Sequence, residues 1–262
     1  MDNKGLLKDN FLEFVEIVKR LRRECPWDKE QTHESLRRCM LEESYEVLES
    51  IDNNDITELK KELGDILLQV VFHTTIGEEQ NTFSLNEVID LEKEKLIARH
   101  PHIFGDVKVS GAEEVKSNWE KLKRKEGRQS VLEGVPAELP ALFKAYRIQE
   151  KAAKVGFDWK DPKPVYDKIL EEIGELKHNI ENGLEQHKIE DEFGDVLFSI
   201  VNYARFLKIN PEDALRKTIA KFSKRFQKIE AFAKSKGIKP EDMTLEEMDV
   251  IWNNAKGDGN EK

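Results

Sequence analysis

Apolar residues recur every three or four positions along much of the chain, and the spacing is clearest between residues 165 and 204. This period places apolar side chains on one face of an amphipathic helix. It predicts two helices here, with inward stripes at Val165, Ile169, Ile173, Leu176 and Ile180, and at Ile189, Phe193, Val196, Leu197, Ile200 and Ala204. We expect the two helices to pack antiparallel along these stripes.

The same period predicts four more helices. One runs through Phe11, Phe14, Val15, Val18 and Leu21 and ends before Cys25, and a loop containing Trp27 follows it. The others span about residues 34–53, 57–75 and 142–155, with a turn at Asp52–Asp55. In the helix of residues 34–53, the expected inward positions are Leu36, Met40, Tyr45 and Leu48.

Acidic residues stand beside the two stripes that begin at Val165. Glu172 and Glu175 are three positions apart, as are Glu192 and Asp195, so each pair shares one helix face. Four carboxylates brought together in this way repel one another, and a hard cation with oxygen ligands, Mg²⁺ or Mn²⁺, relieves the repulsion. The alternative is a solvated acidic face. Gly194 argues against it, because a mid-helix glycine costs about 1 kcal/mol relative to alanine and suits a position where a helix or ligand approaches the backbone.

The acidic pattern occurs twice. Residues 41–46 (LEESYE) match residues 170–175 (LEEIGE), and residues 62–65 (ELGD) match residues 192–195 (EFGD), including the mid-helix glycine. A repeat of about 130 residues is therefore the main feature of the chain. The stretch from Gly127 to Pro140 lacks periodicity. We place the boundary there and predict domains at 1–127 and 128–262.

Paired cations and single tryptophans follow each acidic pattern. Lys95 and Arg99 are four positions apart in the first copy, as are Lys221 and Arg225 in the second. Each pair lies on one helix face, where it is either solvated or available to bind phosphate oxygens. Trp119 and Trp252 follow. Each is either a core residue or a surface on which a nucleobase stacks.

The composition and net charge of the chain limit the classes of function that it can have. The 262 residues are 38% hydrophobic and 37% charged, a lean apolar content that suits long amphipathic helices whose core is completed by oligomerisation. The net charge of −10 disfavours nucleic-acid and anionic-membrane partners. Neither a secretory leader nor a membrane-spanning run is evident, and the two cysteines lack metal or disulfide spacing. We expect a cytoplasmic protein.

The available chemistry favours hydrolysis of a phosphoanhydride. The sequence has no glycine-rich phosphate loop and no recognisable nucleophile motif. Carboxylates holding Mg²⁺, together with Lys and Arg, can bind a phosphate chain and neutralise its charge. A di-iron bundle would need two Glu-x-x-His motifs, and only Glu175-x-x-His178 supplies one. A non-catalytic helical scaffold, or a nucleotide-sensing regulatory protein, is the remaining alternative.

Taken together, the motifs resemble the MazG family of nucleoside triphosphate pyrophosphohydrolases over nearly the whole chain. The resemblance rests on the two acidic signatures and on Cys25-Pro26-Trp27-Asp28, Arg99-His100-Pro101-His102 and Val155-Gly156-Phe157-Asp158-Trp159. It implies an all-α fold with tandem helical-bundle domains and a homodimer with four-helix-bundle cores. It also implies Mg²⁺-dependent hydrolysis of nucleoside triphosphates to the monophosphate and pyrophosphate, with broad base tolerance and a role in cleaning the nucleotide pool.

The resemblance further implies that the second copy carries most of the activity. Its metal ligands would then be Glu172, Glu175, Glu192 and Asp195, with Glu171 orienting or deprotonating the attacking water. The residues expected to contact substrate are Lys168, Lys188, Lys221 and Arg225 for phosphate and Trp252 for the base. The first copy keeps a possible second site at Glu43, Glu46, Glu62, Asp65, Lys95 and Arg99.

Overall fold

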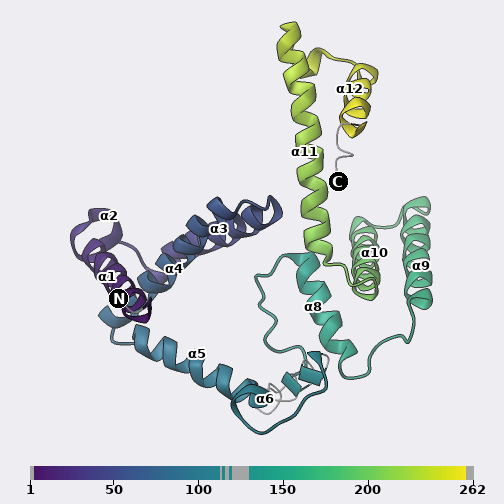
Figure 1. Cartoon of the computed structure of the whole chain (residues 1–262). Coiled ribbons are helices and arrows are strands. Elements are labelled where there is room, and N and C mark those ends of the chain that lie inside the picture. The colour runs from purple at the N-terminus through teal and green to yellow at the C-terminus, as the bar shows by residue number, and fades with distance from the viewer. Residues whose placement is uncertain (1–2, 113, 116–117, 120–129, 258–262) are drawn as a thin grey trace. The chain divides into compact units, whose positions relative to one another are not determined.

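The computed structural model describes residues 3–112, 114–115, 118–119 and 130–257. The elements of the described residues are helices, so the all-α prediction is confirmed (Figure 1). The chain divides into two compact units, Met1–Leu122 and Lys123–Lys262. The predicted boundary after residue 127 lies outside the described residues and stays a prediction. No helix in the described ranges is both long enough and apolar enough to cross a membrane.

The first unit consists of α1 (Asn3–Glu24), α2 (Pro26–Lys29), α3 (His33–Asp52), α4 (Ile56–Glu79), α5 (Leu85–Arg99) and α6 (Pro101–Phe104). Helix α4 packs against both α1 and α3. The core between them contains Val15, Val18, Leu36, Val71, Phe72 and Ile76. Trp27 was predicted to lie in a loop but lies in α2. Pro26 is the first residue of that helix, where its fixed φ favours a helical start.

Side chains at the helix ends explain where α3, α4 and α5 begin. Thr32 and Ser84 form capping boxes at the starts of α3 and α5. The side chain of Asp55 accepts hydrogen bonds from the backbone N–H groups of Thr57 and Glu58, which satisfies two free donors at the start of α4. The predicted turn between α3 and α4 is present, and Asn54 adopts a positive φ of 53° in it.

The second unit consists of α8 (Ala141–Ala153), α9 (Pro162–Glu181), α10 (Gln186–Phe206), α11 (Pro211–Lys236), the 3₁₀ helix η1 (Pro240–Asp242) and α12 (Leu245–Gly257). Helices α9 and α10 lie side by side and are joined by a short turn in which Gly183 has a φ of 61°. Helix α10 also packs on α8, and α12 folds back onto the C-terminal part of the long helix α11 (Figure 1).

The prediction that the apolar stripes of α9 and α10 are buried is wrong for five of their eleven positions. Val165, Ile169 and Val196 are buried. The exposed members are Ile173, Ile180, Phe193, Leu197 and Ile200, each 42% exposed or more. The physical reason is that α9 packs on α10, and α10 also contacts α8 and the start of the chain's next helix, α11, but no further pair of helices among the described residues packs on the exposed side of α9 and α10.

The first unit shows the same departure. Leu36 is buried and Met40 is half-buried, as predicted, but Tyr45 and Leu48 on α3 are 42% and 38% exposed. On α4, Leu63 and Leu67 are exposed as well. Each unit therefore presents an uncovered apolar face along the two helices that carry its acidic residues.

Candidate functional site

Three carboxylates of the second unit converge between α9 and α10. One oxygen from each of Glu172, Glu192 and Asp195 lies within 4.8 Å of the others. Glu172 is 7% exposed on the face of α9 that packs against α10, whereas Asp195 is exposed. The antiparallel packing predicted from the apolar stripes thus brings three of the four expected metal ligands together.

Glu175, the fourth expected ligand, lies outside this group of three but still interacts with it. It is exposed on α9. Desolvation by its surroundings, and then the charges of Glu172 and Glu192, raise the pKa of Glu175 above its ordinary value. The negative charge of the cluster therefore acts on Glu175, one helical turn away from Glu172. A cation bound at the cluster would offset this charge.

Lys168 supplies one counter-charge to the cluster. Its ammonium nitrogen lies 2.6 Å from a carboxylate oxygen of Glu172 and 2.8 Å from one of Glu171. Hydrogen bonds to Glu171 and Glu172 raise the pKa of Lys168, so it stays protonated. Glu171 is exposed and outside the group of three carboxylates, so its suggested role toward the attacking water stays a prediction.

Asn179 holds another member of the cluster in place. This residue is 8% exposed on α9, and its amide nitrogen donates to Glu192 Oε1 at 3.2 Å and, more weakly, to the backbone oxygen of Lys188 at 3.5 Å. The sequence pattern did not identify Asn179 as a site residue. Its side chain fixes the orientation of one carboxylate across the helix pair. Lys188 itself is exposed on the first turn of α10.

A pocket of about 490 Å³ opens beside the carboxylates. Glu172, Asp195 and Lys168 line it together with apolar, aromatic and polar residues, namely Leu132, Ile148, Gln149, Ala152, Phe157, Asp158, Trp159, Val165, Phe198, Ser199, Asn202 and Arg205. Its volume is typical of small-molecule sites. A molecule that fills it would touch charged and apolar surfaces at once.

Two cations, the half-buried Arg205 and the buried Lys151, hold the walls of this pocket. The Arg205 guanidinium on α10 donates to the Asp158 carboxylate, with Nη1 2.9 Å from Oδ2, and also to Asn202. This pair ties the loop that carries Phe157 and Trp159 to α10. Lys151 on α8 is 6% exposed and donates to the backbone oxygen of Glu133 at 2.8 Å, which fixes the segment that carries Leu132.

The cations and the tryptophan predicted on α11 and α12 form a separate group. The Arg225 guanidinium lies 5.6 Å from the centre of the Trp252 ring, and Phe222 contacts the same ring at 5.0 Å. Trp252 also packs on the small core of Ile229, Ala233 and Met243. Lys221 is exposed, and among the described residues neither Lys221 nor Arg225 forms an ion pair with the cluster. Their roles toward phosphate and base stay predictions.

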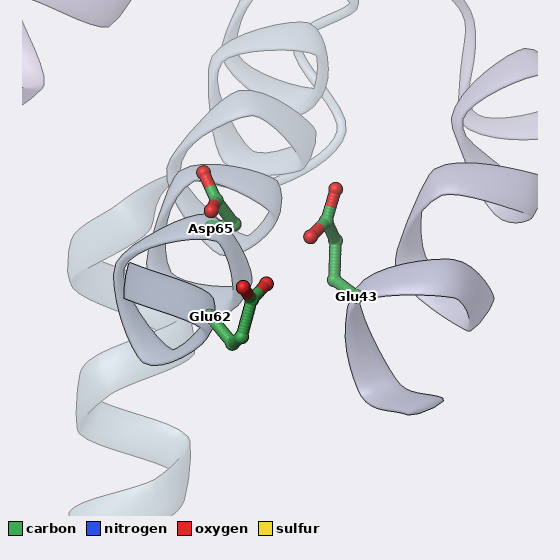
Figure 2. Close-up of side chains that lie close together, drawn as sticks. All are labelled: Glu43, Glu62 and Asp65. Carbon is green, nitrogen blue, oxygen red and sulfur yellow. The ribbon is translucent and has the colours of Figure 1, made fainter. Parts of the chain in front are cut away.

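The first unit forms a matching group of carboxylates. Glu43 projects from α3 toward Glu62 and Asp65 on α4 (Figure 2), and one oxygen from each lies within 4.8 Å of the others. Desolvation and then the neighbouring Glu46 raise the pKa of Glu62 to about 7. Desolvation, followed by the charges of Asp65 and Glu46, raises the pKa of Glu43. Lys95 pairs with Glu92 on its own helix.

Equivalent helix positions differ in charge between the two units. Helices α3 and α9 both have 20 residues, and the seventh is Cys39 in α3 but Lys168 in α9. The third residue of the next helix is Glu58 in α4 but Lys188 in α10. Asn179 is replaced by Ser50, whose hydroxyl donates to the backbone oxygen of Val47. The first unit thus keeps the carboxylates but has lost both cations and the amide that surround them in the second.

The mid-helix glycines lie in open space. A Cβ built at Gly64 or at Gly194 meets no atom of the described residues within 4 Å. Of the two reasons suggested for glycine here, a packed helix or a ligand, the described residues supply no such helix. Helices α4 and α10 each contact their neighbours through other faces.

Comparisons with known proteins identify similar chains along nearly the whole length of this one. Residues 31–104 and 161–229 match the model of the MazG nucleotide pyrophosphohydrolase domain. The nucleoside triphosphate pyrophosphohydrolase/pyrophosphatase MazG of Thermotoga maritima is 46% identical over 262 residues, covering 98% of each protein. A nucleoside triphosphate pyrophosphohydrolase of Escherichia coli (strain K12) is 41% identical over 92% of this chain and 94% of its own length. The crystal structure of a mazG-related protein from Thermotoga maritima is 28% identical, covers 43% of this chain and 97% of that one, and has a TM-score of 0.39.

Proposed function

The chain belongs to the MazG family of nucleotide pyrophosphohydrolases, and on this basis we propose that its second unit hydrolyses nucleoside triphosphates to the monophosphate and pyrophosphate. The observation that carries the proposal is the meeting of Glu172, Glu192 and Asp195 within 4.8 Å, beside a pocket of about 490 Å³. The activity printed in the names of both relatives is the same one.

The donor set of the cluster fits a magnesium ion. All of its ligand atoms are carboxylate oxygens, which hard cations such as Mg²⁺ and Mn²⁺ prefer. His178, which a di-iron site would need, stays outside the group and lies near Asn182 on its own helix. When bound, Mg²⁺ would neutralise phosphate charge and polarise the phosphorus centre under attack. Glu172, Glu192 and Asp195 would hold the ion, and Glu175 would add a further negative charge near it.

The chain's own side chains bind and orient the rest of the substrate. Lys168 pairs with Glu172 and, like it, lines the pocket, where its ammonium group can move from the carboxylate to a phosphate oxygen. The aromatic and aliphatic side chains of the pocket exclude water and receive the base. Release of pyrophosphate, the reaction named for both relatives, breaks the α–β phosphoanhydride bond, so we expect attack at the α-phosphorus.

The charge differences between the units support turnover in the second unit. A triphosphate entering the first site would meet Glu58 and Cys39 where the second site offers Lys188 and Lys168. Carboxylates in place of these lysines repel phosphate, even if an ion is bound at the cluster. The first unit can therefore hold a cation but has weak means of holding a nucleotide.

We also propose that the protein is a homodimer whose bundle cores are completed by the exposed faces of α9 and α10. Ile173 is 45% exposed and Phe193 is 55% exposed in the single chain. Exposed apolar surface extending over two helices indicates an interaction surface. Light scattering on Ile173→Lys should show a monomer, and Leu245→Lys, at a 70% exposed position on α12, should leave the dimer intact. A monomeric wild type would exclude this arrangement.

The direct test of the activity is turnover of nucleoside triphosphates with Mg²⁺, with Mn²⁺ and with EDTA, following monophosphate and pyrophosphate separately. We expect pyrophosphate from all four common bases with either metal and none with EDTA. Release of orthophosphate and a nucleoside diphosphate would contradict attack at the α-phosphorus. A metal-independent rate would contradict the role of the carboxylates.

A further inference from the structure

The loop between α8 and α9 presents two aromatic side chains to the pocket of the second unit. Phe157 and Trp159 both line this pocket, and they are 83% and 44% exposed. Both rings are therefore accessible to a molecule that enters the pocket. Because large apolar side chains gain free energy when they leave water, exposed rings beside a pocket indicate a surface that a ligand covers.

The backbone of this loop is fixed at three points. At its start, the N–H of Phe157 donates to the backbone oxygen of Ala152 at 3.2 Å, which closes the end of α8. In its middle, the Asp158 carboxylate accepts from Arg205 on α10. At its end, the side chain of Asp161 caps the start of α9. The segment that positions both rings is thus ordered before a ligand arrives, so binding loses less conformational entropy.

The pocket extends from the carboxylates to this loop. Asp195 and Arg205 both line it from α10. They are ten positions apart (205 − 195), which is about 15 Å along a helix axis. The carboxylate cluster lies at the Asp195 end, and the loop is tied to the Arg205 end. A nucleotide whose phosphates bind at the carboxylates therefore extends its base toward Trp159.

We propose that the Trp159 ring stacks on the nucleobase of the bound triphosphate. This assignment rests on the proposed nucleotide hydrolysis. Trp159 has the largest aromatic ring system among the residues that line the pocket. Stacking uses only the π-face that every base has, and it selects no hydrogen-bonding edge. A stacked tryptophan therefore suits the broad base tolerance expected for the family, with purines held more tightly than the smaller pyrimidines.

Ribose 5-triphosphate, which has the sugar and phosphate chain of ATP but no base, tests the assignment on the full-length protein with Mg²⁺. For Trp159→Ala, we expect kcat/KM for ATP to fall about 5- to 150-fold, the range that a base–aromatic stack contributes. The value for ribose 5-triphosphate should stay close to that of the wild type. A merely structural role for Trp159 would lower both values alike. Trp159→Phe keeps an aromatic face and should restore most of the preference for ATP.

The matched control is Trp27→Ala, which removes an exposed tryptophan from α2 of the first unit. This variant should keep the wild-type preference for ATP over ribose 5-triphosphate. A second comparison uses the common bases. Because a purine covers more of the tryptophan ring than a pyrimidine does, Trp159→Ala should lower kcat/KM more for ATP and GTP than for CTP and UTP.

The outcomes separate this inference from the proposed function. A wild type that hydrolyses no nucleoside triphosphate overturns the proposed function. An active wild type that hydrolyses ATP and ribose 5-triphosphate equally well overturns the role of Trp159 and leaves the activity standing. A preference for ATP that survives Trp159→Ala, or that disappears with Trp27→Ala instead, has the same meaning. If Trp159→Ala does not fold, Trp159→Leu, which keeps an apolar side chain without a π-face, must lower the preference.

Discussion

Replacing Asp195 by asparagine should change stability in opposite directions with and without metal. The substitution keeps the shape of the side chain and removes one of three negative charges whose oxygens lie within 4.8 Å of one another. At 4.8 Å, two unit charges repel by about 1 kcal/mol in bulk water and by about 3.5 kcal/mol at an effective dielectric constant of about 20. Asp195 is exposed, so the smaller value applies to each of its two neighbours.

In the metal-free protein, we therefore expect Asp195→Asn to gain about 1–2 kcal/mol of stability and a few degrees in Tm. With Mg²⁺ the sign reverses. An ion that binds the folded state stabilises it in proportion to the logarithm of its affinity, and each tenfold loss of affinity removes about 1.4 kcal/mol at saturation. The Mg²⁺-dependent rise in Tm should shrink, and pyrophosphate release should fall by at least 100-fold, as expected when catalytic charge stabilisation is lost.

Thermal unfolding in EDTA and in saturating MgCl₂, combined with a pyrophosphate-release assay, measures all three effects on one preparation. The matched control is Asp65→Asn at the equivalent position of the first unit. We expect it to gain stability without metal but to keep most of the turnover. A variant Asp195→Asn that is less stable in EDTA would refute the repulsion argument. Loss of turnover in Asp65→Asn alone would move the active site to the first unit.

Three further predictions follow from single interactions. Lys168→Met removes the ammonium group 2.6 Å from Glu172, so calorimetry should show tighter Mg²⁺ binding without nucleotide, and kinetics a higher KM for the triphosphate. Asp158→Asn weakens the pair with Arg205 that ties down a pocket wall, so KM should rise several-fold with little change in kcat. Because the pKa of Glu62 is raised to about 7, stability in EDTA should increase as the pH falls from 8 toward 5 and be lost as the pH rises through 7, and Glu62→Gln should flatten this profile.

The helices and the carboxylate cluster were within reach of the sequence because both depend on local spacing. Glu172 and Asp195 meet since each lies next to an apolar stripe, and two stripes that pack together must bring their flanking residues together. The exposed Ile173 and Phe193 show where this reasoning stops. Periodicity identifies which face of a helix is apolar, but it does not say whether the same chain or another one covers that face.

The pocket was not predictable, because its residues are far apart in the sequence and have no periodic relation. Gln149 and Asn179 are ordinary polar residues on amphipathic helices until the packing of α8, α9 and α10 buries them. One signal was available. Aligning the two copies helix by helix places Cys39 opposite Lys168 and Glu58 opposite Lys188, and these charge differences are visible without coordinates. A comparison limited to the acidic residues that both copies share does not show these charge differences.

A comparison of the two units distinguishes the residues that both copies of the fold keep from the residues that would bind a substrate. Both keep a glycine and an acidic pair at the same helix positions, and both gather three carboxylates within 4.8 Å. Holding a cation requires only this much. Holding a triphosphate also requires positive charge around the ion, and only the second unit has Lys168 beside its cluster. In the first unit, desolvation and then the neighbouring Glu46 and Glu58 raise the pKa of Glu62, whereas in the second unit Glu172 pairs with the ammonium group of Lys168. We therefore expect the missing cations at the positions of Lys168 and Lys188 to weaken nucleotide binding at the first site without any change of fold.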